Sequence, residues 1–120
     1  MTPFGIRLRE LRAAETLTLK RMAADLQLSP AYLSALEHGR RGRPSPVLLL
    51  QICDYFHLIW EDADELKRLA ALSHPRVTVD TSGLEADGTE LANLLAERIH
   101  EMEPGLVRRL LALIKGTAKE

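Results

Sequence analysis

Two runs of apolar and polar positions near the start of the chain predict a pair of short helices. The first run, residues 19–26, follows Thr18, whose hydroxyl suits the cap of a helix N-terminus. The second run begins at Pro30 directly behind Ser29, which combines a hydroxyl cap with proline at the first helical position. Gly39 is placed to end that second helix. The pattern therefore predicts two short helices that meet across a tight connection.

The second of these helices has a predicted inner face and a predicted outer face. Leu33 and Leu36 lie three residues apart and can both face the first helix. The remaining sides of the helix carry Ala31, Tyr32, Ala35 and His38. Directly after Gly39 come three cations, Arg40, Arg41 and Arg43. A helix that enters a DNA groove brings its following loop to the phosphates, so this pattern indicates binding rather than catalysis.

The helical pattern stops at residues 73–75, Ser-His-Pro, and the segment after them alternates as a short strand. This strand, with Val77 and Val79 on one face, ends at a turn in residues 80–83. A single strand cannot stabilise itself. The segment is therefore either paired with the same strand of a second chain or an extended linker.

The last forty residues predict a helical hairpin. Thr89 is expected to cap a helix with apolar residues from Leu91 to Met102, and Pro104 and Gly105 then interrupt the pattern. The final helix carries an apolar stripe too broad to be left in water. It either packs on its own domain or forms a dimer interface with a second copy, and we favour the dimer. The expected dimer or partner interface comprises Val77, Val79, Leu91, Leu95, Leu106, Leu110 and Ile114.

Composition narrows the class of protein. The chain has 120 residues, of which 46% are hydrophobic, so one domain with an appendage is expected. No run approaches the roughly 18 apolar residues of a membrane helix, and no signal peptide opens the chain. Cys53, the single cysteine, is expected in the core. We therefore expect a cytoplasmic protein that does not contact a membrane.

The formal net charge of -1 conceals an asymmetry between the two halves of the chain. Residues 1–60 carry eight Lys or Arg against five Asp or Glu, a net charge of +3. Residues 61–120 carry eight against twelve, a net charge of -4. The basic half is the one with the two short helices, and its few cations indicate moderate non-specific affinity for DNA.

Three segments together resemble the Xre-type helix-turn-helix family, to which phage repressors and Cro proteins belong. These segments are Leu17 to Ala23, Ser29 to Gly39 with its Leu36-Glu37-x-Gly39 ending, and Arg43-Pro44-Ser45. The resemblance covers roughly Phe4 to Ile59. It implies an all-α fold, a five-helix lambda-repressor-like DNA-binding domain, here followed by a short extended segment and a C-terminal helical hairpin. The expected domains are residues 1–73 and 74–120, and the expected helices are 4–15, 19–26, 30–38, 46–56 and 61–72.

The resemblance also implies where double-stranded DNA is bound. The expected DNA-binding residues are Lys20, Arg21, Ser29, Pro30, Ala31, Tyr32, Ser34, Ala35, His38, Arg40, Arg41 and Arg43. Each has a structural alternative: the charged residues can form a solvated face, and an aromatic residue such as Tyr32 is ordinarily core. The family's usual phosphate-binding glutamine at the start of the second helix is replaced by Leu19. The base-reading positions lack the amides and guanidinium groups that bond base edges, so modest sequence specificity is expected.

Other candidate residues have structural roles. In the family the position of Glu37 pairs with an arginine of the first helix, here Arg12, so the resemblance implies a structural salt bridge. The four histidines lie at no metal-ligand spacing, so neither a metal site nor a cofactor is expected. Trp60 is expected to plug the space between the fourth and fifth helices and the C-terminal region.

Three classes of function follow from the sequence. The expected function is a sequence-specific DNA-binding transcriptional regulator, a repressor that acts as a homodimer. The alternative is an antitoxin-like or adaptor protein whose C-terminal helices bind a second protein. An enzyme is not expected, because the chain shows no nucleophile and base at a known spacing and no glycine-rich phosphate loop.

Overall fold

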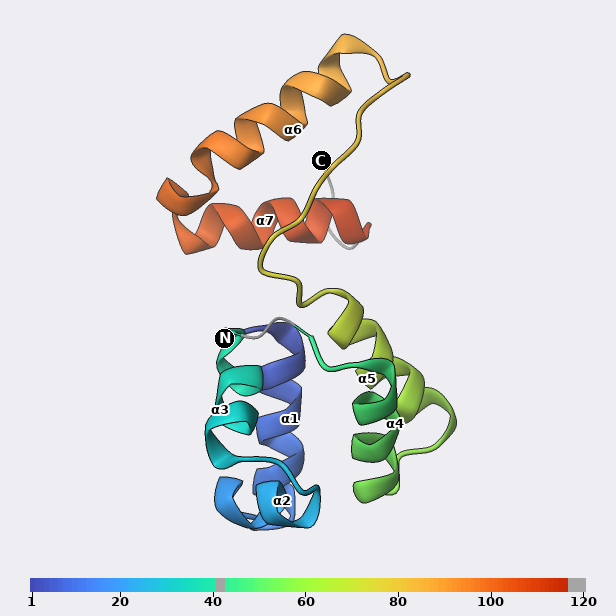
Figure 1. Ribbon diagram of the computed structural model, residues 1–120. Coiled ribbons are helices and arrows are strands. Elements are labelled where there is room, and N and C mark those ends of the chain that lie inside the picture. Colours follow the sequence, from blue (N-terminus) through green and yellow to red (C-terminus); the bar gives the residue numbers. More distant parts are fainter. Residues whose placement is uncertain (41–42, 117–120) are drawn as a thin grey trace. The chain divides into compact units, whose positions relative to one another are not determined.

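The structure is a computed structural model that describes residues 1–40 and 43–116. These residues form seven α-helices and one 3₁₀ helix (Figure 1). The elements are α1 (Pro3–Ala14), α2 (Leu19–Asp25), α3 (Pro30–His38), α4 (Pro46–Tyr55), α5 (Trp60–Ala71), α6 (Ala86–Arg98), η1 (Ile99–Glu101) and α7 (Pro104–Lys115). The chain divides into two compact units, Met1–Val77 and Thr78–Glu120, called unit 1 and unit 2 below. The predicted all-α fold is confirmed.

Four helices of unit 1 begin with the same local device. The hydroxyls of Thr2, Thr18, Ser29 and Ser45 each accept a hydrogen bond, of 3.0–3.2 Å, from the backbone N–H three residues later. This bond satisfies one of the free N–H groups of a helix start. Proline at the first helical position of α1, α3 and α4 fixes φ where no N–H is needed. The caps predicted at Thr18 and Ser29 are confirmed.

Four helices of unit 1 also share the way they end. Thr16, Gln27, Gly39 and His57 follow α1, α2, α3 and α4 with positive φ, between 54° and 80°. The residue after each donates its N–H to a carbonyl five residues earlier, over 2.8–2.9 Å, which ends the helix tightly. Only Gly39 adopts this left-handed conformation without strain. The predicted end of the second helix at Gly39 is confirmed.

The core of unit 1 lies between its five helices. Helix α1 contacts α3 and α5, α2 contacts α3, and α4 contacts α5. The buried apolar residues are Phe4, Leu8, Met22, Ala23, Leu33, Leu36, Leu48, Ile52, Cys53, Phe56, Leu66 and Ala70. The predicted inward placement of Leu33, Leu36 and Cys53 is therefore confirmed. Burial also raises the pKa of the Cys53 thiol.

Two close contacts join the first helix to distant parts of unit 1. Gly5 lies so near α3 that a Cβ there would stand 1.9 Å from the carbonyl oxygen of Glu37. The buried Ser73 hydroxyl accepts a 2.9 Å hydrogen bond from the Phe4 N–H and donates one of 2.6 Å to the Leu69 carbonyl. Ser73 thus ends α5 and supports the start of α1 with one side chain.

The position of Trp60 differs from the prediction. Its side chain is 81% exposed at the first residue of α5, where φ is 51°. It therefore does not fill the space between α4 and α5, and that prediction was wrong. Leu58, two residues earlier, is partly buried and packs against the core in its place.

Unit 2 begins with an extended segment and a turn. Within the described residues, 77–80 form no strand in the single chain. Asp80 accepts hydrogen bonds from the N–H and the hydroxyl of Ser82, which lower the pKa of its carboxyl. Helix α6 starts at Ala86, and the hydroxyl of Thr89 donates to that of Thr81. The helix cap predicted at Thr89 was therefore wrong, because the helix begins three residues earlier.

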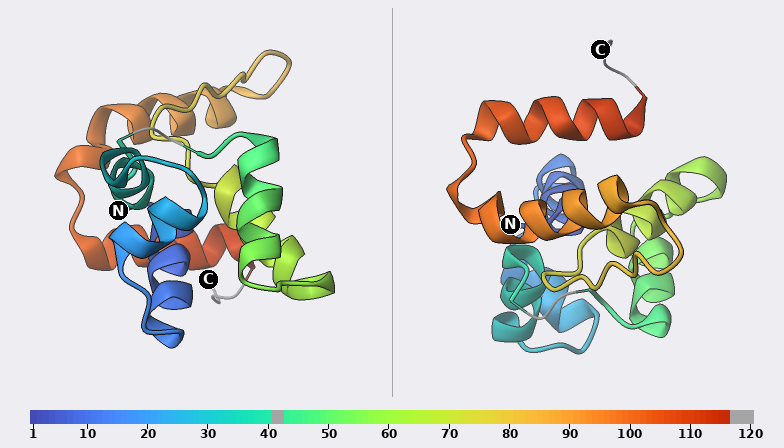
Figure 2. Two further views of the ribbon diagram at one scale, coloured as in Figure 1. Left: turned by 60° about the horizontal axis from the view of Figure 1, so that its bottom comes forward. Right: turned by 90° about the horizontal axis from the view of Figure 1, so that it is seen from above.

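The helices of unit 2 leave their common turn at an open angle. Helix α6 passes through η1 to Met102 and Glu103, and α7 then starts at Pro104 (Figures 1 and 2). No side chain in the described part of unit 2 is buried. None of the described helices combines the length and the apolar character needed to cross a bilayer.

Candidate nucleic-acid interface

Helix α3 is held by one face and free on the other. Leu33, Leu36 and Glu37 are its buried residues, and they fix how the helix is rotated about its axis. Pro30, Ala31 and His38 are exposed, and Ser34 and Ala35 are half-buried. The free face is small and carries few bulky groups, so a groove of nucleic acid can approach the helix backbone closely.

Tyr32 lies between these two faces. Its side chain is half-buried and packs against the core, so only part of the ring is available to a ligand. The Ser29 hydroxyl is occupied as the cap of α3, where it accepts from the Tyr32 N–H. These two residues contribute to the proposed interface mainly by placing the start of α3.

His38 has a defined orientation at the end of α3. Its Nδ1 lies 2.8 Å from the Ser34 carbonyl oxygen. Because a carbonyl oxygen only accepts, this hydrogen bond places the hydrogen on Nδ1 and leaves Nε2 unused by this contact. Nε2 is then the atom that His38 can offer to a ligand.

The loop behind α3 supplies the next cations. Arg40 and Arg43 are exposed, and the predicted Arg41 lies outside the described residues. Pro44 is buried directly after Arg43, which ties the end of the loop to unit 1. Exposed guanidinium groups that directly follow a helix with a free face are suited to phosphate contact.

Lys20 and Arg21, in the first turn of α2, are both exposed. The Arg21 Nε lies 3.1 Å from Asp25, which also accepts a 2.6 Å hydrogen bond from the Tyr55 hydroxyl of α4. The bond from Tyr55, with help from Arg21, lowers the pKa of the Asp25 carboxyl. Burial, together with that bond, raises the pKa of Tyr55 to about 12. Asp25 and Tyr55 were not predicted: the i,i+4 spacing of Arg21 and Asp25 was a usable signal, whereas Tyr55 is thirty residues away.

The structure brings Arg12 and Glu37 together. The Arg12 Nη2 lies 2.8 Å and 3.1 Å from the two carboxylate oxygens of Glu37, and Nη1 donates to the Leu17 carbonyl. The side chain of Glu37 is only 2% exposed and that of Arg12 14%. This ion pair, in which one guanidinium nitrogen donates to both carboxylate oxygens, joins α1 to the inner face of α3 and thereby supports the free face.

The residues predicted for a dimer or partner interface fall in two sets. Leu95, Leu110 and Ile114 line one apolar pocket between α6 and α7. Val77, Val79, Leu91 and Leu106 are exposed outside that pocket. Among the described residues, no group of three or more His, Cys, Asp or Glu side chains is placed to hold a metal ion.

Comparison with known proteins locates the similarity in unit 1. The model of a family described as "Helix-turn-helix domain" matches residues 3–69. The chain is also similar to the HTH-type transcriptional regulator RghRB of Bacillus subtilis (strain 168), with 37% identity over 62 residues. That alignment covers 52% of this chain and 45% of the relative, so the chain spans about half the length of the relative it matches. No solved structure matches the chain.

Proposed function

Because this chain belongs to the Xre-type helix-turn-helix family, we propose that it is a sequence-specific DNA-binding transcriptional regulator that places α3 in the major groove. The observation that carries the proposal is the free face of α3. Its inner face is fixed by Leu33, Leu36 and the Arg12–Glu37 pair, while Ala31 and its neighbours stay open. A helix presented in this way fits the groove docking of helix-turn-helix proteins.

In this proposal the contacts divide by chemistry. Ala31 and Ala35 meet thymine methyl groups, and Ser34 and His38 supply the polar contacts to the groove. Arg40, Arg43, Lys20 and Arg21 contact phosphates. Arg21 does so in competition with Asp25, its partner in the free protein. The small number of base-reading groups makes specificity depend on two half-sites.

The regulator acts as a homodimer and a repressor in the cytoplasm of a prokaryote. A two-fold dimer presents two α3 helices to half-sites one DNA turn apart, which doubles the number of base contacts. Occupied DNA then excludes the polymerase. The open apolar face of unit 2 supports association, and it equally supports an alternative function, an antitoxin-like or adaptor protein whose α6 and α7 bind a different protein.

The test is selection of binding sites from a random duplex pool by the full-length chain at near-physiological salt. We expect enrichment of a two-fold symmetric site. Salt-sensitive binding without any enriched motif would contradict a sequence-reading regulator. A monomeric chain that enriches a single half-site would instead favour the adaptor function.

Substitution of Ala31 tests whether α3 is the reader. Ala31→Glu adds one carboxylate to the free face without touching the core, and it should abolish binding to the selected site. Ala13→Glu is the matched control, since Ala13 is exposed and lies on the side of α1 opposite the buried Phe4 and Leu8. Binding retained by Ala31→Glu, with both variants folded by circular dichroism, would exclude α3 as the reader.

The loop cations are tested by the dependence of binding on salt. Replacing Arg40 and Arg43 with Gln should weaken binding to all duplexes alike and flatten the log–log salt slope by about 0.9 for each lost contact. Arg9→Gln removes one exposed cation from α1 and should leave the slope unchanged. An unaltered slope in the double variant would remove the loop from the interface.

A further inference from the structure

Unit 2 carries many apolar side chains, and none of those that the structure describes is buried. Ile114 is 80% exposed, Leu91 66%, Leu111 48% and Ile99 46%. A segment of this size that leaves its aliphatic groups in water lacks the main stabilising term of folding. Its helices therefore depend on a surface that unit 2 does not supply by itself.

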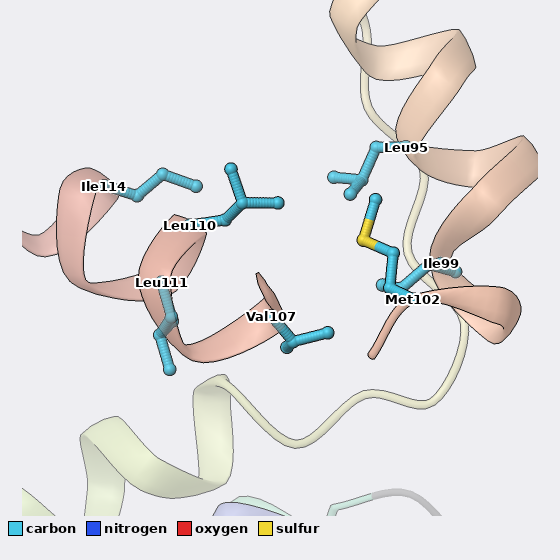
Figure 3. Close-up of a pocket in the computed structure, with 7 residues that line it drawn as sticks. All are labelled: Leu95, Ile99, Met102, Val107, Leu110, Leu111 and Ile114. Atoms are coloured by element: carbon cyan, nitrogen blue, oxygen red, sulfur yellow. The ribbon is translucent and has the colours of Figure 1, made fainter. Parts of the chain in front are cut away.

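Seven of the apolar side chains of unit 2 line one pocket. A space of about 150 Å³ opens between the two arms of the hairpin, with only apolar residues around it. Leu95 and Met102 point across this space toward Leu110 (Figure 3). The pocket is open to solvent in the single chain, and it is suited to accept aliphatic side chains.

The width of the apolar surface on each helix indicates how many neighbours that helix needs. At 100° per residue, the stripe of α7 from Leu113 round to Leu111 spans about 160°. The arc of α6 from Leu94 round to Ala92 also spans about 160°. It holds Leu91 and Leu95, with Asp87 and Arg98 inside it only at the two ends of the helix. An arc of this width exceeds the seam that one partner helix covers, and it fits a helix with two neighbours, as in a four-helix bundle. One hairpin supplies two helices, so a bundle of four needs two copies.

The two helices of unit 2 differ in net charge. Helix α6 carries Asp87, Glu90 and Glu97 against the single cation Arg98. Helix α7 carries Arg108, Arg109 and Lys115 and no acidic residue. On a helical projection Glu90 and Glu97 flank one edge of the α6 stripe, and Arg109 and Arg108 flank the two edges of the α7 stripe. An α6 helix and an α7 helix are therefore complementary in charge.

We infer that unit 2 pairs with unit 2 of a second copy as a four-helix bundle in which each α6 lies between the α7 of its own chain and the α7 of the partner. This order places an acidic helix beside a basic helix at every contact. The alternative order, α6 beside the partner's α6, sets Glu90 and Glu97 against the same residues of the other copy, which is repulsive. The inference rests on the homodimer of the proposed function and specifies how that dimer is built.

The contribution of apolar contacts to the dimer is tested at a residue that is mostly exposed in the single chain. Ile114 is 80% exposed, so Ile114→Glu removes little from an isolated chain, whereas in the bundle it buries a carboxylate. Sedimentation velocity of the full-length variant should show a dissociation constant raised at least about tenfold. Asn93→Glu, an equal charge change at an exposed position on the side of α6 opposite the stripe, is the control and should leave the dimer intact. An Ile114→Glu chain that dimerises like the native one would overturn the inference.

The order of helices is tested by reversing all four flanking charges in one chain. The variant Glu90→Lys, Glu97→Lys, Arg108→Glu, Arg109→Glu has a basic α6 and an acidic α7. In the proposed order it forms its own dimer, because every contact again joins opposite charges. In the proposed bundle the edge of α6 that carries Glu90 and Glu97 faces the partner's α7. Mixed with the native chain, the variant therefore meets like charges at the contacts between chains, so the two proteins should sort into separate homodimers.

Native mass spectrometry of the mixture, with the two chains distinguished by mass, gives the decisive result. Self-sorting supports the inference. Mixed dimers at or above the statistical share of about half show that α6 meets the partner's α6, or that these charges lie outside the interface, and either overturns it. A monomeric variant overturns it as well.

The same measurements separate failure of this inference from failure of the proposed function. If the native chain is a dimer but the charge-reversed variant does not self-sort, the proposal of a homodimeric regulator stands and only the proposed order of helices is wrong. If the native chain is monomeric, both the proposed bundle and the proposed homodimer are wrong. DNA-site selection still reports on α3 in that case, because the core and the free face of α3 belong to unit 1.

Discussion

Unit 1 and unit 2 both consist of short amphipathic helices, yet they differ in whether their apolar side chains are buried. In the described part of unit 1 the hydrophobic core holds twelve buried side chains, and hydroxyl caps begin four of the five helices. In unit 2 neither helix has a side-chain cap, and no described side chain is buried. The contrast indicates that unit 1 folds on its own contacts, whereas unit 2 needs a further surface, which we propose is a second copy of the chain.

The largest expected effect lies in the core of unit 1. Phe4 is fully buried, so Phe4→Ala should lower the free energy of unfolding of unit 1 by about 3–5 kcal/mol. Ile6→Ala, on the exposed side of the same helix, should cost about 0.5 kcal/mol. Urea unfolding of both variants at two protein concentrations checks this. A loss that depended on concentration would break the distinction between the units.

The next largest effect comes from the buried ion pair. Arg12→Ala leaves the Glu37 carboxylate buried without its partner, and it should cost about 3 kcal/mol. Arg21→Ala breaks the exposed pair with Asp25 and should cost less than about 1 kcal/mol. Equal losses in the two variants would show that burial of Glu37 does not govern the Arg12 contact.

Unit 2 should respond to dilution, and unit 1 should not. If association completes unit 2, each tenfold dilution lowers its stability by about 1.4 kcal/mol. Hydrogen exchange should therefore accelerate in α6 and α7 on dilution of the full-length chain and stay constant in α1 to α5. Protection of α6 and α7 that did not change with concentration would show that unit 2 is stable alone.

The same contrast explains what the sequence could predict. The limits of the helices at 19–26 and 30–38 were predicted to within about one residue, because caps such as Ser29-Pro30 and the terminator Gly39 act locally. The limits of the other three helices of unit 1 came from the family resemblance. Leu33 and Leu36 followed from periodicity, since the face of a helix is also a local property. The Arg12–Glu37 partnership came from the family resemblance and not from spacing.

Long-range and marginal contacts could not be predicted from the sequence. The bond between Tyr55 and Asp25 joins residues thirty apart, and nothing local selects that pair. Trp60 was expected to be covered because it is apolar, but Leu58 occupies the space at the core. Thr89 was expected as a cap because its hydroxyl precedes an apolar run. Without a core to fix its ends, α6 instead starts at Ala86.

The smallest effect concerns the polar contact that ties α2 to α4 within unit 1. The pKa of Tyr55 is raised to about 12, so its contribution to stability is present below its ordinary pKa of about 10 and is lost as pH rises through 12. The pKa of Asp25 is lowered, so its contribution is present above its ordinary value of 3.8 and is lost as pH falls through the lowered value. Tyr55→Phe should therefore be slightly less stable than the native chain between about pH 4 and pH 10, and the difference should shrink on either side.

Two measurements check this last expectation. Urea unfolding of native and Tyr55→Phe chains across the pH range gives the difference in stability directly. Absorbance titration of a Tyr32→Phe chain, in which Tyr55 is the only tyrosine left, should show the phenol ionising near pH 12. A phenol that ionises near its ordinary value in the folded chain would mean that α2 and α4 are joined by apolar packing alone. Unit 1 would then differ from unit 2 in the number of its buried side chains and not in this polar contact.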